Sequence, residues 1–269
     1  MVEPSAGSNH QRLMTGDTAR TFLTAEWRYL AMLTFETEPG LLQPFVPCGT
    51  ELDTHDGRAL LSLVGFRFLR THVLGCRVPF HQDFEEVNLR FYVRREVQGE
   101  LRRGVTFIRE MVPRRLIAFV ARLAYNEPYV TLRMQSDVPP APVAVPRRIR
   151  YAWRTSAGWQ SLALTAVGAP MLPDEATEYA FISEHHWGYT RQRDGSTLEY
   201  RVEHPPWRLW VGADATVSGN MAEVFGNALG RSLSTAPTSA FLGEGSPVTV
   251  TQPRQLGVAP DVASLQGAA

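Results

Sequence analysis

The sequence lacks lysine altogether: all 27 basic side chains are arginine, and they balance 27 acidic side chains to a net charge of zero. A lysine imine, a lysine general base and a phosphate-binding P-loop lysine are therefore excluded. Arginine stays charged and can bind a carboxylate or a phosphate through two parallel hydrogen bonds. The zero net charge argues against a dedicated nucleic-acid-binding protein, which normally carries a basic excess.

Cysteine and long apolar runs are scarce as well. Cys48 and Cys76 are too few for a disulfide scaffold and have no metal-ligand spacing, so both are expected to be small buried apolar side chains. No apolar run approaches the roughly 18 residues of a membrane span. The first 20 residues contain no hydrophobic signal segment. These absences predict a cytoplasmic protein with no membrane partner.

The pattern of apolar residues predicts many strands and few helices. Strands are expected at 26–36, 49–71 (a hairpin turning at Asp56-Gly57), 84–94, 104–111, 129–135, 149–155, 160–167, 187–204 (a hairpin turning at Asp194-Gly195), 207–216 and 247–253. Short helices are expected near 39–45, at 113–123 and at 220–229, with a proline-rich connector at 139–146 and a loop from 230 to 246. This order favours an α+β, mostly antiparallel barrel or sandwich over a doubly wound nucleotide-binding fold.

The most informative segment is the strand at 84–94. Its polar side chains Glu86, Asn88, Arg90 and Tyr92 share one face, opposite an apolar one. Such a face is usually solvated. It could instead line a barrel interior, where Glu86 would transfer a proton and Arg90 would hold an anionic group.

Two further arginines lie among apolar neighbours, Arg109 in GVTFIREM and Arg122 after the helical run. Each could bind a ligand or pair with a structural carboxylate such as Glu110 or Glu127. Glu184-His185-His186 is a weak metal motif, because neighbouring side chains of an extended segment point to opposite faces. The run HPPWRLW (204–210) could be a ligand wall, although such tryptophans are more often core anchors. No nucleophile motif and no glycine-rich phosphate loop occurs, so neither a metal nor an organic cofactor is predicted.

Several of these segments together resemble a known family. The runs EEVNLRFYVRR, GVTFIRE and ARLAYNEPYVTLRM, followed by EYRVEHPPWRLW and NMAEVFG, are similar to the YqjF-like proteins of the DUF2071 family. The resemblance implies an acetoacetate decarboxylase-like fold: a single domain at 21–257, built as a curved β-barrel around an internal cavity with a few short helices. Residues 1–20 would be a mobile lead and 258–269 a disordered tail.

The resemblance also implies a site. In the decarboxylase a lysine forms the imine, helped by a cavity glutamate and an arginine. Here the comparable tract is Asn126-Glu127-Pro128-Tyr129, which places Tyr129 at the lysine position and makes Glu86 the counterpart of the glutamate. With no lysine in the chain, imine-based decarboxylation cannot be transferred.

Two hypotheses of different class remain. In the first, the protein binds a small anionic organic molecule, such as a carboxylate, and acts on it by a proton-transfer or lyase step. Glu86 and Tyr129 would then be catalytic, and Asn88, Arg90, Arg109 and Arg122 would bind the substrate. In the second, the protein is a non-catalytic ligand- or protein-binding module whose polar residues satisfy one another, as in a buried Glu86–Arg90 pair. Assembly into a homo-oligomer, and closure of residues 217–246 over the cavity, are left open.

Overall fold

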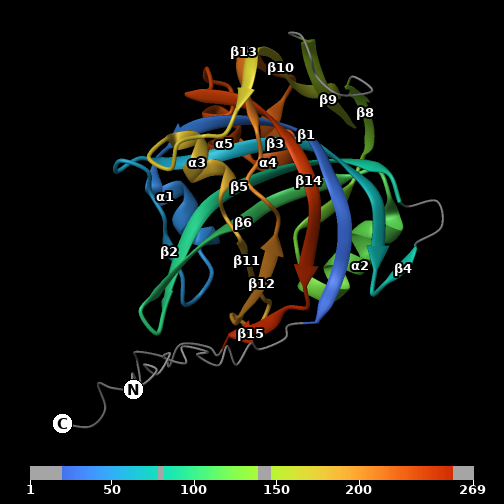
Figure 1. Cartoon of the computed structure of the whole chain (residues 1–269). Helices are drawn as coiled ribbons and strands as arrows, with labels where there is room; N and C mark the ends of the chain where they lie inside the picture. The colour runs from blue at the N-terminus through green and yellow to red at the C-terminus, as the bar shows by residue number, and fades with distance from the viewer. Residues whose placement is uncertain (1–19, 78–81, 139–146, 257–269) are drawn as a thin grey trace, which may run out of the picture.

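A computed structural model describes residues 20–77, 82–138 and 147–256 (Figure 1). The predicted connector at 139–146, the tail, and all of the lead except Arg20 lie outside the described residues. The strands are β1 (Thr21–Thr37), β2 (Glu51–Leu52), β3 (Ala59–Val73), β4 (Cys76–Arg77), β5 (Phe84–Val97), β6 (Glu100–Val112), β7 (Tyr129–Thr131), β8 (Arg133–Asp137), β9 (Arg147–Thr155), β10 (Gly158–Met171), β11 (Trp187–Arg191), β12 (Thr197–Glu203), β13 (Leu209–Ser218), β14 (Ser239–Thr251) and β15 (Arg254–Leu256). The helices are α1 (Pro39–Leu42), a 3-10 turn (Gln43–Phe45), α2 (Arg115–Tyr125), α3 (Glu178–Ser183), α4 (Met221–Phe225) and α5 (Asn227–Ser232).

These strands join into one sheet. Hydrogen-bonded neighbours run in the order β12-β11-β6-β5-β3-β1-β14 and continue through β13, β10 and β9 to β8. β12 also pairs with β14, so the succession from β12 to β14 returns to its own first strand. The pairings are antiparallel except those of β6 with β7 and with β11. The prediction of a mostly antiparallel sheet with few helices is thus confirmed.

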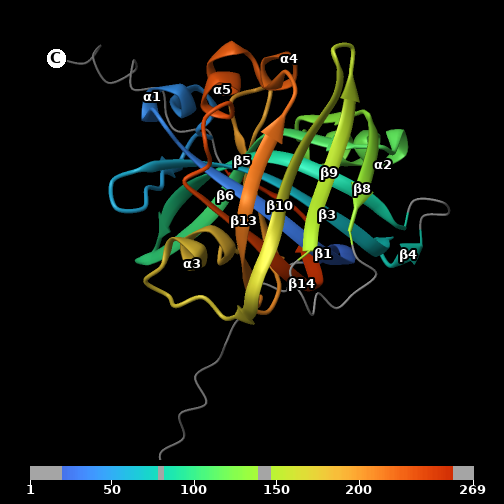
Figure 2. The same ribbon diagram turned by 90° about the horizontal axis from the view of Figure 1, so that it is seen from above.

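β1, β3 and β5 separate two apolar layers, because alternate side chains of a strand point to opposite faces. On one face Leu63 packs in the same cluster as Trp153 of β9. Figure 2 shows β9 and β10 crossing this side of the long strands. On the other face Val64 packs in one cluster with Ala118 of α2 and Phe181 of α3. The polar residues of β5 lie in this second layer.

The loop predicted before the last strand is wrong in its second half. Residues 239–246 begin β14 and pair with β1 from Trp27 to Thr34. Their glycines suggested a loop, yet they are needed for close packing: a Cβ on Gly245 would overlap the Trp27 carbonyl oxygen. Residues 217–246 therefore comprise the end of β13, α4, α5 and this half of β14.

Two smaller expectations also fail. The turn at Asp56-Gly57 forms, with His55 and Arg58 exchanging backbone hydrogen bonds of 3.1 and 2.9 Å, but β2 pairs with β5 instead of β3. Cys76 is exposed and Cys48 is half-buried, so neither is a buried apolar side chain. Cys76 lies in a two-residue strand at the sheet edge, where no second layer covers it.

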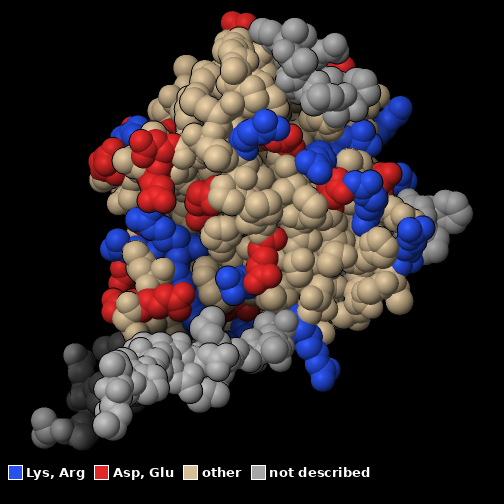
Figure 3. Space-filling view, viewed as in Figure 1, with Lys and Arg blue, Asp and Glu red and all other residues tan. Residues whose placement is uncertain are grey.

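The described chain contains no helix that is long and apolar enough to cross a lipid bilayer. On the face drawn in Figure 3, arginine and acidic side chains lie beside one another and do not form separate fields. This interspersion agrees with the zero net charge of the chain.

One buried carboxylate, that of Glu199, holds the four strands β5, β6, β12 and β15 together. Glu199 of β12 is 2% exposed and forms ion pairs with Arg95, Arg102 and Arg254 at 2.9, 3.1 and 2.8 Å. We expect Glu199→Gln to lower the free energy of unfolding by about 1.5–3 kcal/mol, because the charge-assisted hydrogen bonds from three partly exposed arginines would be lost. The control is Glu100→Gln, which removes an exposed partner of the same Arg102 and should cost less than about 1 kcal/mol. Urea unfolding of both variants measures the difference, and equal losses would contradict the assignment.

Candidate functional site

A β-bulge decides which side chains of β6 share the face of Glu86. Asn88 pairs with Glu110 and Leu89 with Arg109, but Arg90 pairs with Phe107, so one extra residue of β6 lies between them. In a regular strand Phe107 and Glu110, three residues apart, would point to opposite faces. Because of the bulge, both reach the face of β5 that carries Asn88. Arg109 is left opposite Leu89, on the face of the other apolar layer.

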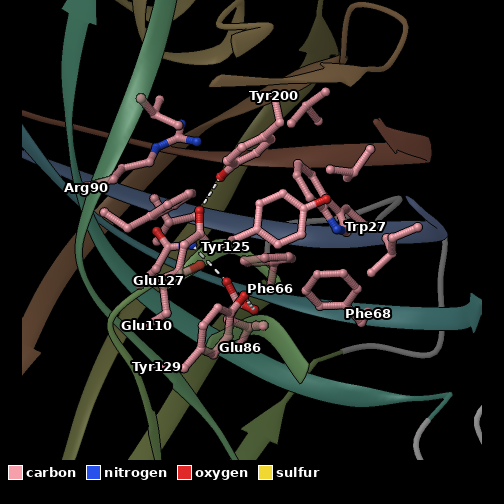
Figure 4. A pocket seen from close by; sticks show the side chains of 18 of the residues that line it. Trp27, Phe66, Phe68, Glu86, Arg90, Glu110, Tyr125, Glu127, Tyr129 and Tyr200 are labelled. Carbon is pink, nitrogen blue, oxygen red and sulfur yellow. Dashed lines mark hydrogen bonds between the residues drawn. The ribbon is translucent and has the colours of Figure 1, made fainter. Parts of the chain in front are cut away.

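The Glu86 face borders a cavity of about 180 Å³. Its wall comes from β1, β3, β5, β6, α2, the 127–129 segment, β12 and the segments before β11 and β13. Apolar and aromatic side chains dominate, among them Trp27, Phe66, Phe68, Phe84 and Trp207. Figure 4 shows the three phenyl and indole groups of Trp27, Phe66 and Phe68 on one side and the acidic residues on the other. The cavity therefore has an apolar part and a polar end.

Glu86 is buried at the polar end. Its carboxylate accepts hydrogen bonds of 3.1 Å from Asn88 Nδ2 and 3.1 Å from the Tyr129 hydroxyl. Burial, with a smaller contribution from the charge of Glu127, raises the pKa of Glu86 to about 8 against the effect of these two hydrogen bonds. The carboxyl group of Glu86 is thus mainly protonated at neutral pH.

Two more buried glutamates lie beside Glu86. Asn126 has a positive φ of 55° just after α2, and the chain then turns so that Glu127 and Tyr129 enter the cavity wall. Glu110 is hydrogen-bonded to Glu127, and burial together with the charges of Glu127 and Glu86 raises the pKa of Glu110 well above its usual range. Burial also raises the pKa of Glu127. The pair therefore shares at least one proton near neutrality.

Glu127 is the best hydrogen-bonded of the three acids. Besides Glu110, it accepts hydrogen bonds from the Tyr200 hydroxyl and, at 3.1 Å, from Thr190. The Tyr200 ring lies edge-on to Tyr125, with centroids 4.8 Å apart. These contacts oppose the rise in the pKa of Glu127, which makes it the acid best suited to carry a negative charge.

Arg90 lines the cavity four residues further along β5 than Glu86. Its guanidinium donates a hydrogen bond of 3.0 Å to the Ile182 carbonyl oxygen, and Nε is buried without a partner. No carboxylate in the described chain forms an ion pair with Arg90, so the closed Glu86–Arg90 pair of the second hypothesis is not formed. Nearby His185 stays neutral, because burial and the charges of Arg90 and Arg103 hold its pKa well below its usual range.

The structure brings four of the six predicted site residues to one cavity: Glu86, Asn88, Arg90 and Tyr129. Arg109 is not among the described residues that line it, because the bulge turns it to the other face. The Arg122 side chain lies outside the described residues. Whether any of these residues acts on a ligand stays a prediction.

Two of the three buried glutamates were not among the predicted site residues. From the sequence, Glu110 and Glu127 are expected only as ion-pair partners of arginine, and Tyr200 is not singled out. The family resemblance placed Glu127 next to Tyr129, which was a usable signal. For Glu110 the sequence offers no such signal, because the bulge that brings it to this face depends on the pairing of β5 with β6.

The fold and the cavity place the protein in a structural class. It is similar to the acetoacetate decarboxylase of Legionella pneumophila, with a TM-score of 0.65 and 13% identity over 94% of this chain and 98% of that one. It is also similar to the enduracididine biosynthesis enzyme MppR, with a TM-score of 0.60 and 14% identity over 95% and 99% of the two chains. These TM-scores, over nearly the whole of each chain, establish a shared acetoacetate decarboxylase-like fold.

The family follows from the sequence. Residues 24–246 match the DUF2071 family of uncharacterised conserved proteins, and the chain belongs to that family. Its relative YqjF of Bacillus subtilis strain 168 is 26% identical over 199 residues, which cover 72% of this chain and 77% of YqjF. The expected resemblance is confirmed.

Proposed function

We propose that this protein binds a small organic molecule in the cavity and that Glu86 exchanges a proton with the head group of that molecule. The observation that carries the proposal is a fully buried, mainly protonated carboxyl group at the wall of an aromatic-lined cavity. A titratable group perturbed in this way, beside an apolar pocket with a few convergent polar groups, is characteristic of binding and active sites.

The lining supports a ligand with an apolar body. In this proposal the strand succession closes as a curved barrel, and the cavity is its interior. A cavity of about 180 Å³ has room for a molecule of about a dozen non-hydrogen atoms. Trp27, Phe66 and Phe68 would pack against its body, and the acid cluster would meet its polar end.

Glu86 would act as acid or base, and Tyr129 would hold it in place. A protonated Glu86 can donate to a basic atom of the ligand and take the proton back when the ligand leaves. Burial raises the pKa of Tyr129 well above its usual range, so its hydroxyl stays a hydrogen-bond donor. Since the chain has no lysine, the reaction cannot pass through a lysine imine, although the fold neighbour MppR was solved with pyruvate bound.

A two-arginine clamp for a carboxylate is not part of this proposal. The expected clamp needs Arg90 and Arg109 together, and only Arg90 lines the cavity. Arg90 alone, which already donates to a backbone carbonyl oxygen, supports an anionic ligand less strongly than two arginines would.

The competing function is a non-catalytic binding protein with a structural polar network. It is favoured by one observation: both oxygens of Glu86 already have hydrogen-bond partners. The two functions predict different results for the substitution Glu86→Gln. Proton exchange requires that Glu86→Gln change binding or turnover in the folded protein, whereas a structural role predicts a change in stability with binding and turnover unchanged.

Filling the cavity tests the binding site. Ala121 of α2 lines the cavity, and we expect Ala121→Trp to weaken binding of 3-phenyl-1-propanol at least tenfold, because the indole would occupy the space of the ligand. Isothermal titration calorimetry measures the affinity, and unfolding curves show whether the variant is folded. Ile117→Trp is a second blocking variant, and Ala176→Trp, at an exposed position, is the control. Unchanged affinity in both folded blocking variants would contradict the proposed site.

A further inference from the structure

We propose that the ligand is an amine, held as an ammonium ion by Glu86, Glu110 and Glu127. This inference rests on the proposed ligand-binding function and names the chemical class of the ligand. It departs from the anionic ligand expected from the sequence.

The charges around the cavity favour a cation. Among the described residues that line it, three carry a carboxyl group and one, Arg90, carries a guanidinium. None of the three glutamates forms an ion pair in the described chain, and the sequence has no lysine to supply one. Because a buried carboxylate is stable only beside a compensating charge, Glu86 and at least one member of the Glu110–Glu127 pair keep their protons while no cation is bound. An ammonium ion would supply the missing charge.

The unsatisfied hydrogen-bonding atoms at the acidic end favour a donor. Asn88 Oδ1 and Glu110 Oε2 are buried without partners, in residues that are 3% and 2% exposed and that line the cavity. Amide and carboxylate oxygens accept hydrogen bonds, and an ammonium group offers up to three N–H donors. A ligand carboxylate offers none. The same two atoms would therefore be satisfied by an amine and left without partners by an anion.

The aromatic groups around the acids fit the same ligand. Tyr125, Tyr129 and Tyr200 surround Glu127 and Glu86 (Figure 4). Tyr129 and Tyr200 meet the acids through their hydroxyl groups, whose oxygens can each accept a hydrogen bond from an ammonium group. The apolar side chains of Trp27, Phe66 and Phe68 continue the wall away from the acids. This arrangement suits a primary amine on an aryl or alkyl body.

Arg90 does not occupy the amine position. It lies four residues from Glu86 on one strand, so their Cα atoms are about 13 Å apart. Its guanidinium is directed to the Ile182 carbonyl oxygen, beside α3. The positive charge of the protein is therefore at one end of the polar wall, and the uncompensated acids are at the other.

Binding must displace a proton. An amine that arrives as an ammonium ion expels the proton of Glu86 to solvent, and one that arrives as a free base takes that proton onto its nitrogen. Both routes end in the same ammonium–carboxylate pair, with no other bond made or broken. The titratable or charged groups of the described wall that line the cavity together with Glu86 are Glu110, Glu127, Tyr125, Tyr129, Tyr200, Arg90, His185 and His204.

Three isosteric probes test the inference: 3-phenylpropylamine, 3-phenyl-1-propanol and 3-phenylpropanoate, each titrated calorimetrically at pH 6, 7 and 8. The amine stays charged over this range. We expect it to bind tightest, with affinity rising about tenfold per pH unit from 6 to 7, because binding requires ionised Glu86. The alcohol should show no pH dependence. Glu86→Gln should weaken the amine at least tenfold and leave the alcohol unchanged. Glu85→Gln, the adjacent residue, whose carboxylate accepts from Ser136, is the matched control and should change neither.

Each outcome has a separate meaning. Tighter binding of the propanoate, or amine affinity that is insensitive to both pH and Glu86→Gln, overturns the amine inference while binding of the alcohol keeps the proposed cavity function. If none of the three probes binds to the wild-type protein, the proposed function itself fails. Proton release that accompanies amine binding at pH 7, measured in buffers of different ionisation enthalpy, gives a second readout that a change in stability would not produce.

Discussion

We expect the free energy of unfolding of the wild-type protein to fall as the pH rises from about 5 to 8.5, and Glu86→Gln to remove much of that fall. The pKa of Glu86 is about 8 in the folded protein, against about 4.3 in an unfolded chain. Between these values the unfolded chain has lost the proton and the folded chain has kept it. The unfolded state then binds fewer protons, so stability decreases as the pH rises.

The size of this effect follows from the same two values. At about 1.4 kcal/mol for each pH unit between them, Glu86 alone contributes at most roughly 4–5 kcal/mol. Glu110 and Glu127, whose pKa values are also raised, act in the same direction. Glutamine can keep the contacts with Asn88 and Tyr129 but cannot ionise, so the variant should be the more stable protein at pH 8.5.

Guanidinium unfolding at pH 5, 7 and 8.5 measures the effect. The control is Glu100→Gln, because that side chain is exposed and its removal should leave the slope of stability against pH unchanged. If the free energies of unfolding of the wild-type protein and Glu86→Gln changed with pH in the same way, Glu86 would be ionised in the folded state. That result would contradict the account of the site.

The second large effect is expected from a substitution of Gly188, a glycine close to the buried glutamates. Gly188 of β11 pairs with Tyr200 of β12, and the Tyr200 ring lies directly over it. A Cβ at this position would overlap the ring, which is buried and bonded to Glu127. Gly188→Ala should therefore displace the ring and lose its hydrogen bond, at a loss of about 2–4 kcal/mol in stability.

Two comparisons separate the causes of this loss. Gly243→Ala is the steric control, because a Cβ there would lie 3.4 Å from the Leu30 Cβ, an ordinary contact, and the loss should be below about 1 kcal/mol. Tyr200→Phe removes the hydroxyl alone and should cost about 1–2 kcal/mol. Thermal unfolding of the three variants ranks them by their loss of stability. A Gly188→Ala protein as stable as Gly243→Ala would show that the ring does not lie where we place it.

How far the sequence predicts the structure depends on how local each feature is. The Glu86 face was predictable, because strict alternation over 84–94 shows which side chains share a side. The short helix before Tyr129 was predictable from its apolar spacing and from Pro113. The start of β14 was not, since its glycines are required by contacts with β1, which lies more than 200 residues earlier in the chain.

The site, too, depends on contacts between residues that are distant in the sequence. Whether the Glu86 face is solvated or internal depends on α2 and β12 covering it, which no pattern within β5 reveals. Arg109 and Glu110 are neighbours, and one bulged residue exchanges their faces. The apolar neighbours of Arg109 made it a binding candidate in the sequence and favoured an anionic ligand, whereas the folded chain presents Glu110 to the cavity.

One measurement tests the central claim most directly: the carboxyl ¹³C shift of Glu86 followed by NMR from pH 5 to 9, assigned by its loss in Glu86→Gln, without and with saturating 3-phenylpropylamine. We predict titration near pH 8 in the free protein, and an ionised carboxylate down to pH 6 in the complex. A Glu86 that is already ionised at pH 6 in the free protein, or one whose titration the amine leaves unchanged, would contradict the account.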